Sequence, residues 1–170
     1  MEDFVTQYFL ATGAGWTVIG AMFAVMFGGV GSARGIRIAG GQAAGVLSEK
    51  PELFGKLLVL MALPGTQGFY GFIIAIFMAA QTGLLGGALK VTPLMGLALM
   101  AVGICAGVVL YRSAVYQGEA AAASISLTAR RPDESGRSIL IPALVETYAV
   151  VALLASILFI MWVTAMKVGA

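Results

Sequence analysis

Four stretches of this sequence are long and apolar enough to cross a lipid bilayer, and they leave almost nothing for a soluble domain. They run from 4 to 33, from 57 to 89, from 91 to 111 and from 138 to 166. A hydrocarbon core of about 30 Å is crossed by roughly 20 residues of helix. With 60% hydrophobic and only 11% charged residues, the chain is not an ordinary soluble domain. The sequence predicts an all-α membrane protein, with four transmembrane helices in one domain over 1–170.

Several other classes of protein are excluded by the same sequence. Glu2 and Asp3 stand where a secretory signal peptide would carry basic residues, so we expect the first stretch to be a helix of the mature protein. With no His and a single Cys, the sequence offers no Cys/His metal site and no disulfide framework. The net charge of +2 comes from residues that flank the apolar stretches, and no nucleic-acid partner is predicted.

The chain contains an internal repeat of about 80 residues. The matched segments are Ser32-Ala33 with Ser113-Ala114, Lys50-Pro51-Glu52 with Arg131-Pro132-Asp133, and Lys56 with Arg137. Each unit reads as a helix, a short charged turn and a second helix, and the two units cover about 4–86 and 87–167. Because both units run in the same direction, the repeat predicts a parallel duplication of one helical hairpin.

Basic residues gather near the two turns of this repeat. They are Arg34, Arg37, Lys50, Lys56, Arg112, Arg130, Arg131 and Arg137. Only Lys90 and Lys167 belong to the opposite side, together with Glu2 and Asp3. Since basic residues concentrate in cytoplasmic loops, we expect both turns to be cytoplasmic and both termini to be external.

Glu146 is the only charge between Arg137 and Lys167. Carboxylates inside a membrane segment are costly and usually functional. One interpretation is a buried, hydrogen-bonded carboxyl that stays neutral, because burial raises the pKa of such a group. The other is a site that binds and releases a cation or a proton.

Counting from the second turn places Gln117 beside Glu146. Gln117 lies 15 residues before Pro132 and Glu146 lies 14 after it, so both should be roughly 21 Å from the turn. The third helix must then continue past Arg112. Its arginine, like Arg34 and Arg37 on the first helix, would face a polar or protein-lined space and not lipid.

The segment 63–71 supplies further oxygen atoms at a similar depth. Leu63, Thr66, Gln67 and Tyr70 occur at i, i+3, i+4 and i+7, which is one helix face. They offer a backbone carbonyl, a hydroxyl, an amide and a phenol. Small hard cations prefer oxygen ligands, so a carboxylate with several neutral oxygens suits Na⁺.

Small residues recur every four positions along the first and third helices. The series are Gly20, Ala24, Gly28, Ser32; Gly31, Gly35, Ala39, Ala43; Gly103, Gly107; and Ala114, Gly118, Ala122, Ser126. Such stripes let helix backbones approach closely. They are compatible with packing inside one monomer. Stripes on more than one face of a helix favour a crowded ring of subunits with the first and third helices innermost.

These segments resemble the K subunit, or proteolipid, of bacterial V-type ATPases, especially the sodium-translocating kind. The matching segments are Leu63-Pro64-Gly65-Thr66-Gln67-Gly68-Phe69-Tyr70-Gly71-Phe72, Gln117-Gly118 and Val145-Glu146-Thr147-Tyr148-Ala149. The duplicated hairpin matches as well, so the resemblance covers nearly the whole chain. Arg112 and Glu119 depart from the family pattern, and Glu119 should point to a different face from Gln117.

The resemblance implies a ligand set for Na⁺ and a set of partners. The ligands would be the Leu63 carbonyl, Thr66, Gln67, Gln117 and Glu146, with Tyr70 donating a hydrogen bond to Glu146. It implies one carboxylate for four helices, with Gln67 standing where the second hairpin carries its acid.

The implied partners are identical subunits in a rotor ring, a membrane stator subunit with a functional Arg, a central-stalk subunit at the cytoplasmic turns, and lipid. The location would be the cell membrane of a prokaryote. ATP chemistry would belong to other subunits, since the chain has no P-loop motif, and no organic cofactor is expected.

Three alternatives remain open at this point. The same ring could carry H⁺, which requires Glu146 but not the neutral oxygens. A self-contained transporter of an organic cation would need an aromatic pocket near Glu146, and Trp16 and Trp162 lie at other heights. A purely structural membrane protein would leave the carboxylate and the amides near mid-membrane without a role.

Overall fold

The computed structural model describes residues 2–166 and consists of four long helical spans without a strand in that range. The elements are α1 (Glu2–Val5), η1 (Thr6–Ala11), α2 (Ala14–Glu49), η2 (Pro51–Leu53), α3 (Phe54–Ala62), η3 (Leu63–Gly65), α4 (Thr66–Gln81), α5 (Pro93–Arg130), η4 (Pro132–Glu134), α6 (Ser135–Ser138) and α7 (Leu140–Ala165). The spans Ala14–Glu49, Pro51–Gln81, Pro93–Arg130 and Pro132–Ala165 are long and apolar enough to cross a membrane. The predicted all-α membrane fold is confirmed.

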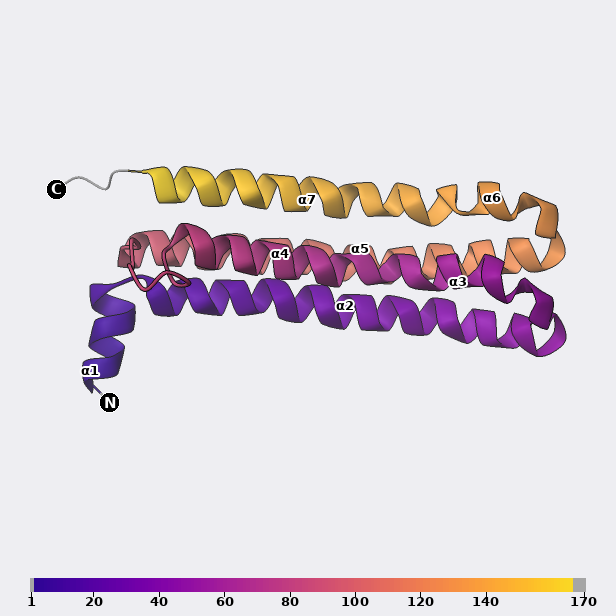
Figure 1. The fold of residues 1–170 in the computed structure, drawn as a ribbon, viewed down its shortest axis with the longest axis horizontal. Helices are drawn as coiled ribbons and strands as arrows, with labels where there is room; N and C mark the ends of the chain where they lie inside the picture. Colours follow the sequence, from indigo (N-terminus) through magenta and orange to yellow (C-terminus); the bar gives the residue numbers. More distant parts are fainter. Residues whose placement is uncertain (1, 167–170) are drawn as a thin grey trace.

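The chain forms two hairpins that run in the same direction (Figure 1). Both turns lie at one end of the bundle, and the N-terminal segment and the end of α7 lie at the other. α2 and α5 run parallel along the bundle, each followed by its returning span. The arrangement is the duplicated helical hairpin that the repeat predicts; Lys167 lies outside the described residues.

The first membrane helix begins later than the sequence suggests. The sequence predicts a start near Phe4, but α2 starts at Ala14, and residues 2–11 form a separate helical segment turned away from the bundle (Figure 1). The break lies at Thr12, whose backbone is extended (φ −127°, ψ 158°). The Gly13 amide donates instead to the carbonyl of Val91, which ties the break to the start of α5.

Glycine allows α2 and α5 to touch along their backbones. Gly13 lies against Gly96, Gly20 against Gly103 and Gly35 against Gly118, each pair 83 positions apart in the sequence. A Cβ placed on Gly118 would come within 2.5 Å of the Gly35 Cα. The small-residue stripes therefore bring these two helices together, as such stripes do in membranes.

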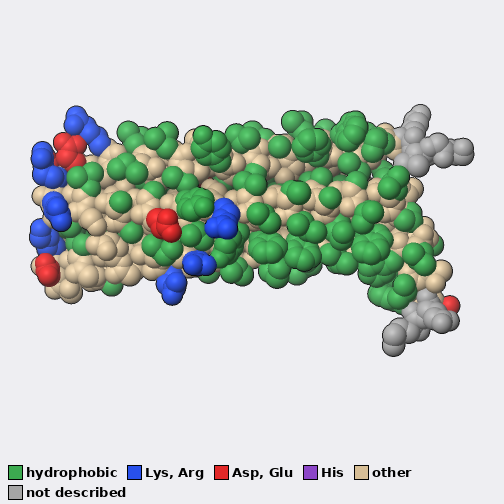
Figure 2. All heavy atoms as spheres, turned by 180° about the vertical axis from the view of Figure 1, so that it is seen from behind, with side chains coloured by type: hydrophobic (Ala, Val, Ile, Leu, Met, Phe, Trp, Pro, Cys, Tyr) green, Lys and Arg blue, Asp and Glu red, His purple; other side chains and the backbone are tan. Residues whose placement is uncertain are grey.

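α2 and α5 are continuous past the arginines near their centres. This confirms the expectation that the third helix continues beyond Arg112. Arg34, Arg37, Arg112 and Glu119 are exposed in the single chain. Figure 2 shows charged side chains part-way along the bundle, separate from the larger group at the turns. Arg34 donates to the Tyr111 hydroxyl at 2.8 Å.

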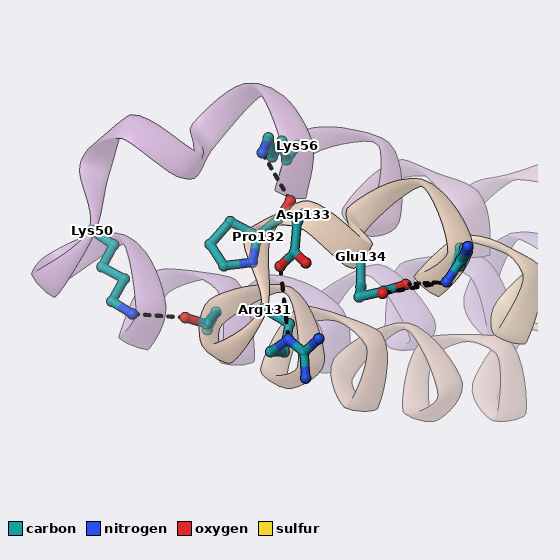
Figure 3. A network of polar contacts seen from close by, with 8 residues as sticks. Lys50, Lys56, Arg131, Pro132, Asp133 and Glu134 are labelled. Atoms are coloured by element: carbon teal, nitrogen blue, oxygen red, sulfur yellow. Dashed lines mark hydrogen bonds and ion pairs between the residues drawn. The ribbon is translucent and has the colours of Figure 1, made fainter.

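Polar contacts join the two turns to each other (Figure 3). The Lys50 ammonium donates to the Ala129 carbonyl at 2.7 Å, and the Lys56 ammonium donates to the Pro132 carbonyl at 2.9 Å. Both lysines belong to the first hairpin and both acceptors to the second. These contacts hold the two turns at the same end of the bundle.

Candidate functional site

A break in the second span positions the first group of oxygen atoms. Pro64 has no backbone N–H to continue the helix ladder, and η3 interrupts the span between α3 and α4. The Thr66 hydroxyl then donates to the Leu63 carbonyl at 3.2 Å. The carbonyl and the hydroxyl are thereby held next to each other at the start of α4.

Two buried amides connect α4 to α5. Gln67 and Gln117 are fully buried, and the Gln67 Nε2 donates to the Gln117 Oε1 at 2.6 Å. The Thr66 hydroxyl lies 3.3 Å from the Gln67 Oε1. The oxygens of Leu63 and Thr66 are therefore connected to the two amides. Polar side chains buried at this depth are costly unless they are hydrogen-bonded, and this pair is.

Glu146, on α7, lies beside this group and is only partly buried in the single chain. The Tyr70 hydroxyl donates to its Oε1 at 2.6 Å, and the Gln117 Nε2 lies 3.3 Å from its Oε2. The height predicted for Gln117 and Glu146 by counting from Pro132 is therefore confirmed. Six residues from three spans, including all those expected from the resemblance, lie in one connected set.

Sequence reasoning missed two groups that contact this set. Ser113 accepts from the Gln67 Nε2 at 3.4 Å and donates to the Val145 carbonyl at 3.4 Å. The Pro142 carbonyl accepts from the Gln117 Nε2 at 3.2 Å. Ser113 could have been found, because it precedes Gln117 by one helical turn on the same face. Pro142 contributes a backbone atom, which residue type does not reveal.

The set is rich in neutral oxygen and holds one carboxylate. Hard monovalent and divalent cations are bound by oxygen atoms, whereas Zn²⁺ prefers His and Cys. Among the residues that the structure describes, no three His, Cys, Asp or Glu side chains gather at one place. Glu119 and Arg112 are exposed in the single chain. The arrangement places one carboxylate, Glu146, among neutral oxygen and amide groups.

Comparison with known proteins decides the family. The family model described as the C subunit of ATP synthase matches the chain twice, over residues 19–78 and 100–159. The chain belongs to this family of ATP synthase ring proteins. Its members are non-catalytic, ion-translocating subunits of rotary ATPases, and they assemble into rings of identical copies.

Two relatives extend this similarity over most of the chain. The K subunit of the V-type sodium ATPase of Enterococcus hirae is 35% identical over 161 residues, which cover 95% of this chain and 98% of the relative. The K subunit of the A-type ATP synthase of Methanocaldococcus jannaschii is 38% identical over 152 residues, which cover 89% of this chain and 64% of the relative.

The two matches to the family model correct one detail of the repeat. They begin 81 positions apart, at residues 19 and 100. At this offset Glu146 corresponds to Gly65, and Gln67 corresponds to Tyr148. The expectation that Gln67 stands at the equivalent of Glu146 is therefore wrong. At this offset the first hairpin carries Gly65 where the second carries Glu146.

Proposed function

We propose that this chain is the ion-carrying rotor subunit of a V-type ATPase and that the ion it carries is Na⁺, bound at Glu146. The ligands are the Leu63 carbonyl, the Thr66 hydroxyl, the Gln67 and Gln117 amide oxygens and the Glu146 carboxylate, with Tyr70 holding Glu146 in place. The observation that carries the proposal is the position of Gln117, which contacts both Gln67 and Glu146. It joins the neutral oxygens of the second and third spans to the carboxylate of the fourth.

The transport cycle is electrostatic. Bound Na⁺ neutralises Glu146, so this part of the ring can face lipid as the ring turns. At the stator a fixed arginine competes for the carboxylate and the ion leaves. Because a ligand shifts an equilibrium only through different affinities for two states, the stator must lower the affinity of the site for Na⁺. ATP is hydrolysed or made on other subunits, coupled through a central stalk at the turns.

The choice of Na⁺ over H⁺ depends on the neutral oxygens. A proton needs only the carboxylate, whereas the fully buried amides of Gln67 and Gln117 have a reason to be at this depth if they coordinate a metal ion. The Enterococcus hirae relative is named as part of a sodium ATPase, which supports the same choice. The same ring carrying H⁺ is the alternative.

Na⁺ should protect Glu146 from labelling by a carbodiimide at fixed pH. Gln67→Ala and Gln117→Ala should each raise the Na⁺ concentration for half-maximal protection several-fold, since a lost polar contact costs at least about 1 kcal/mol. Gln67→Leu, which keeps most of the side-chain volume, separates the lost ligand from a cavity. Tyr70→Phe should have a different effect, because it removes a hydrogen bond to Glu146 and leaves the ligands intact.

Two outcomes of this measurement would reject the sodium proposal. One is the absence of protection in the unchanged protein. The other is an unchanged half-maximal concentration in both Ala variants. After the first outcome the proton ring takes its place, because labelling of Glu146 would then respond to pH and not to Na⁺. The second outcome would show that neither amide is a ligand of the ion.

The orientation in the membrane is a second part of the proposal. Both turns are cytoplasmic, because the basic residues gather there. In a Cys105→Ser background, cysteine introduced at Ser48 or Ser135 should react with an impermeant reagent only from the cytoplasmic face. Cysteine introduced at Asp3 should react only from the external face. Reaction of Ser48→Cys and Ser135→Cys on opposite faces would contradict this orientation.

A further inference from the structure

Arg37 and Glu119 are charged residues at membrane depth that lack an ion-pair partner within the described part of their own chain. Both are exposed, on α2 and α5 respectively. Arg37 lies 14 residues before Pro51 and Glu119 lies 13 before Pro132, so both are near the height of Glu146. Within residues 2–166 the ion pairs are Arg131 with Asp133 and Arg137 with Glu134, all at the turn end. Charges inside a membrane protein usually pair with one another.

The internal repeat predicts what these residues meet in the ring. Inside one chain α2 packs on α5. In a closed ring of parallel hairpins, α5 of one copy packs on α2 of the next copy, and the repeat gives that contact the same register with other side chains. Each contact between copies is therefore obtained by exchanging residues for their repeat equivalents, which lie 81 positions later on α5 and 81 earlier on α2.

The exchange converts glycine contacts into contacts between larger residues. Gly35 against Gly118 becomes Tyr116 of one copy against Arg37 of the next. Gly20 against Gly103 becomes Ala101 against Met22 of the next copy. In the single chain Tyr116 is 51% exposed and Met22 is 58% exposed. Large side chains that are exposed in the single chain on these faces of α2 and α5 are expected where a second copy packs against them.

We propose that Arg37 of one copy lies between Tyr116 and Glu119 of the next copy, forming an ion pair with Glu119 and a cation–π contact with Tyr116. Glu119 follows Tyr116 by three residues, so both lie on one face of α5. The helical rise between them, about 4.5 Å, is within reach of an arginine side chain. The planar guanidinium is suited to bind a carboxylate and to stack on a ring at the same time.

This pairing rests on the ring assembly of the family and not on the choice of Na⁺. It also predicts two unequal junctions that alternate around the ring. The junction inside each copy is closed by glycine backbones, and the junction between copies is filled by side chains of both charge signs. Assembly can be measured without any ion transport. Rejection of Na⁺ as the ion would therefore leave the Arg37–Glu119 pair untouched, and rejection of the pair would leave the choice of ion untouched.

Charge reversal tests the pairing. Arg37→Glu and Glu119→Arg should each lower the temperature at which the purified ring dissociates into single copies, because like charges then meet between copies. The double variant Arg37→Glu/Glu119→Arg should recover most of that loss. The matched control is Arg34→Glu/Glu119→Arg, which carries the same net charge and should recover none. Additive losses in the first double variant, or equal recovery in the control, would overturn the pairing.

Crosslinking gives a second test that does not depend on stability. In a Cys105→Ser background, Arg37→Cys/Glu119→Cys rings treated with a short thiol crosslinker should yield a ladder of covalent oligomers. Mixed rings built from Arg37→Cys chains and Glu119→Cys chains should yield dimers and nothing larger. If only monomers appear in both preparations, the two residues face lipid or water and the proposal is wrong.

Discussion

Replacing Glu146 by Gln should abolish ion transport and leave the ring assembled. Gln keeps the shape of the side chain, and its oxygen can still accept the hydrogen bond from Tyr70. Its amide group would replace the oxygen beside the Gln117 Nε2, which costs about one hydrogen bond, roughly 1 kcal/mol. What is lost completely is the charge that, in the proposed cycle, alternates between the ion and the stator arginine.

The measurement is ATP-driven ²²Na⁺ uptake into vesicles that contain the whole reconstituted complex. Asp3→Asn, which removes one exposed carboxylate on the N-terminal segment, is the matched control and should transport normally. Assembly of the Glu146→Gln ring is checked by its mass in detergent. Normal uptake by that variant would contradict the role given to Glu146 in carrying Na⁺.

Gly118→Val should separate α2 from α5 and disrupt the ring. Even the first carbon of the new side chain would lie 2.5 Å from both the Cα and the carbonyl oxygen of Gly35, closer than atoms approach without a shift. Overpacking of this kind costs about 1–3 kcal/mol, and contact with rigid backbone places it at the upper end. Because Gln117 is adjacent in the sequence, protection of Glu146 by Na⁺ should weaken as well.

Gly55→Val is the matched control. Gly55 lies on α3, outside the contacts of α2 with α5, and a Cβ added there would meet nothing within 4 Å. The same substitution should therefore leave the dissociation temperature of the ring unchanged or slightly raised, since Gly is the poorer helix former. An equal fall in both variants would show that valine weakens the helices themselves and that the close contact of α2 with α5 is not the cause.

The architecture could be predicted from the sequence because few structures satisfy a backbone inside a bilayer. Long apolar stretches become helices, and the repeat of Lys50-Pro51 as Arg131-Pro132 fixes two parallel hairpins. The start of α2 was not predictable in this way. Residues 4–11 are as apolar as a membrane helix, and the break at Thr12 depends on the Gly13 amide finding the Val91 carbonyl. That contact joins residues far apart in the sequence.

The site was partly predictable for a related reason. Equal distances from Pro132 place Gln117 and Glu146 at one height, and helical spacing places Thr66, Gln67 and Tyr70 on one face. Which amide nitrogen meets which oxygen depends on the rotation of each helix about its axis. That rotation is set by packing contacts such as Gly28 against Gln67. For the same reason the carbonyl of Pro142 could not be foreseen.

The glycine contacts between α2 and α5 also determine how the rotor responds to torque. An interface filled by side chains can yield through small changes of rotamer, whereas touching backbones yield only when the helices themselves bend. The two hairpins of one copy should therefore rotate as one rigid unit. Elastic twist should accumulate at the more compliant contacts between copies. In such a ring the geometry around each Glu146 should stay constant while the ring as a whole bends under load.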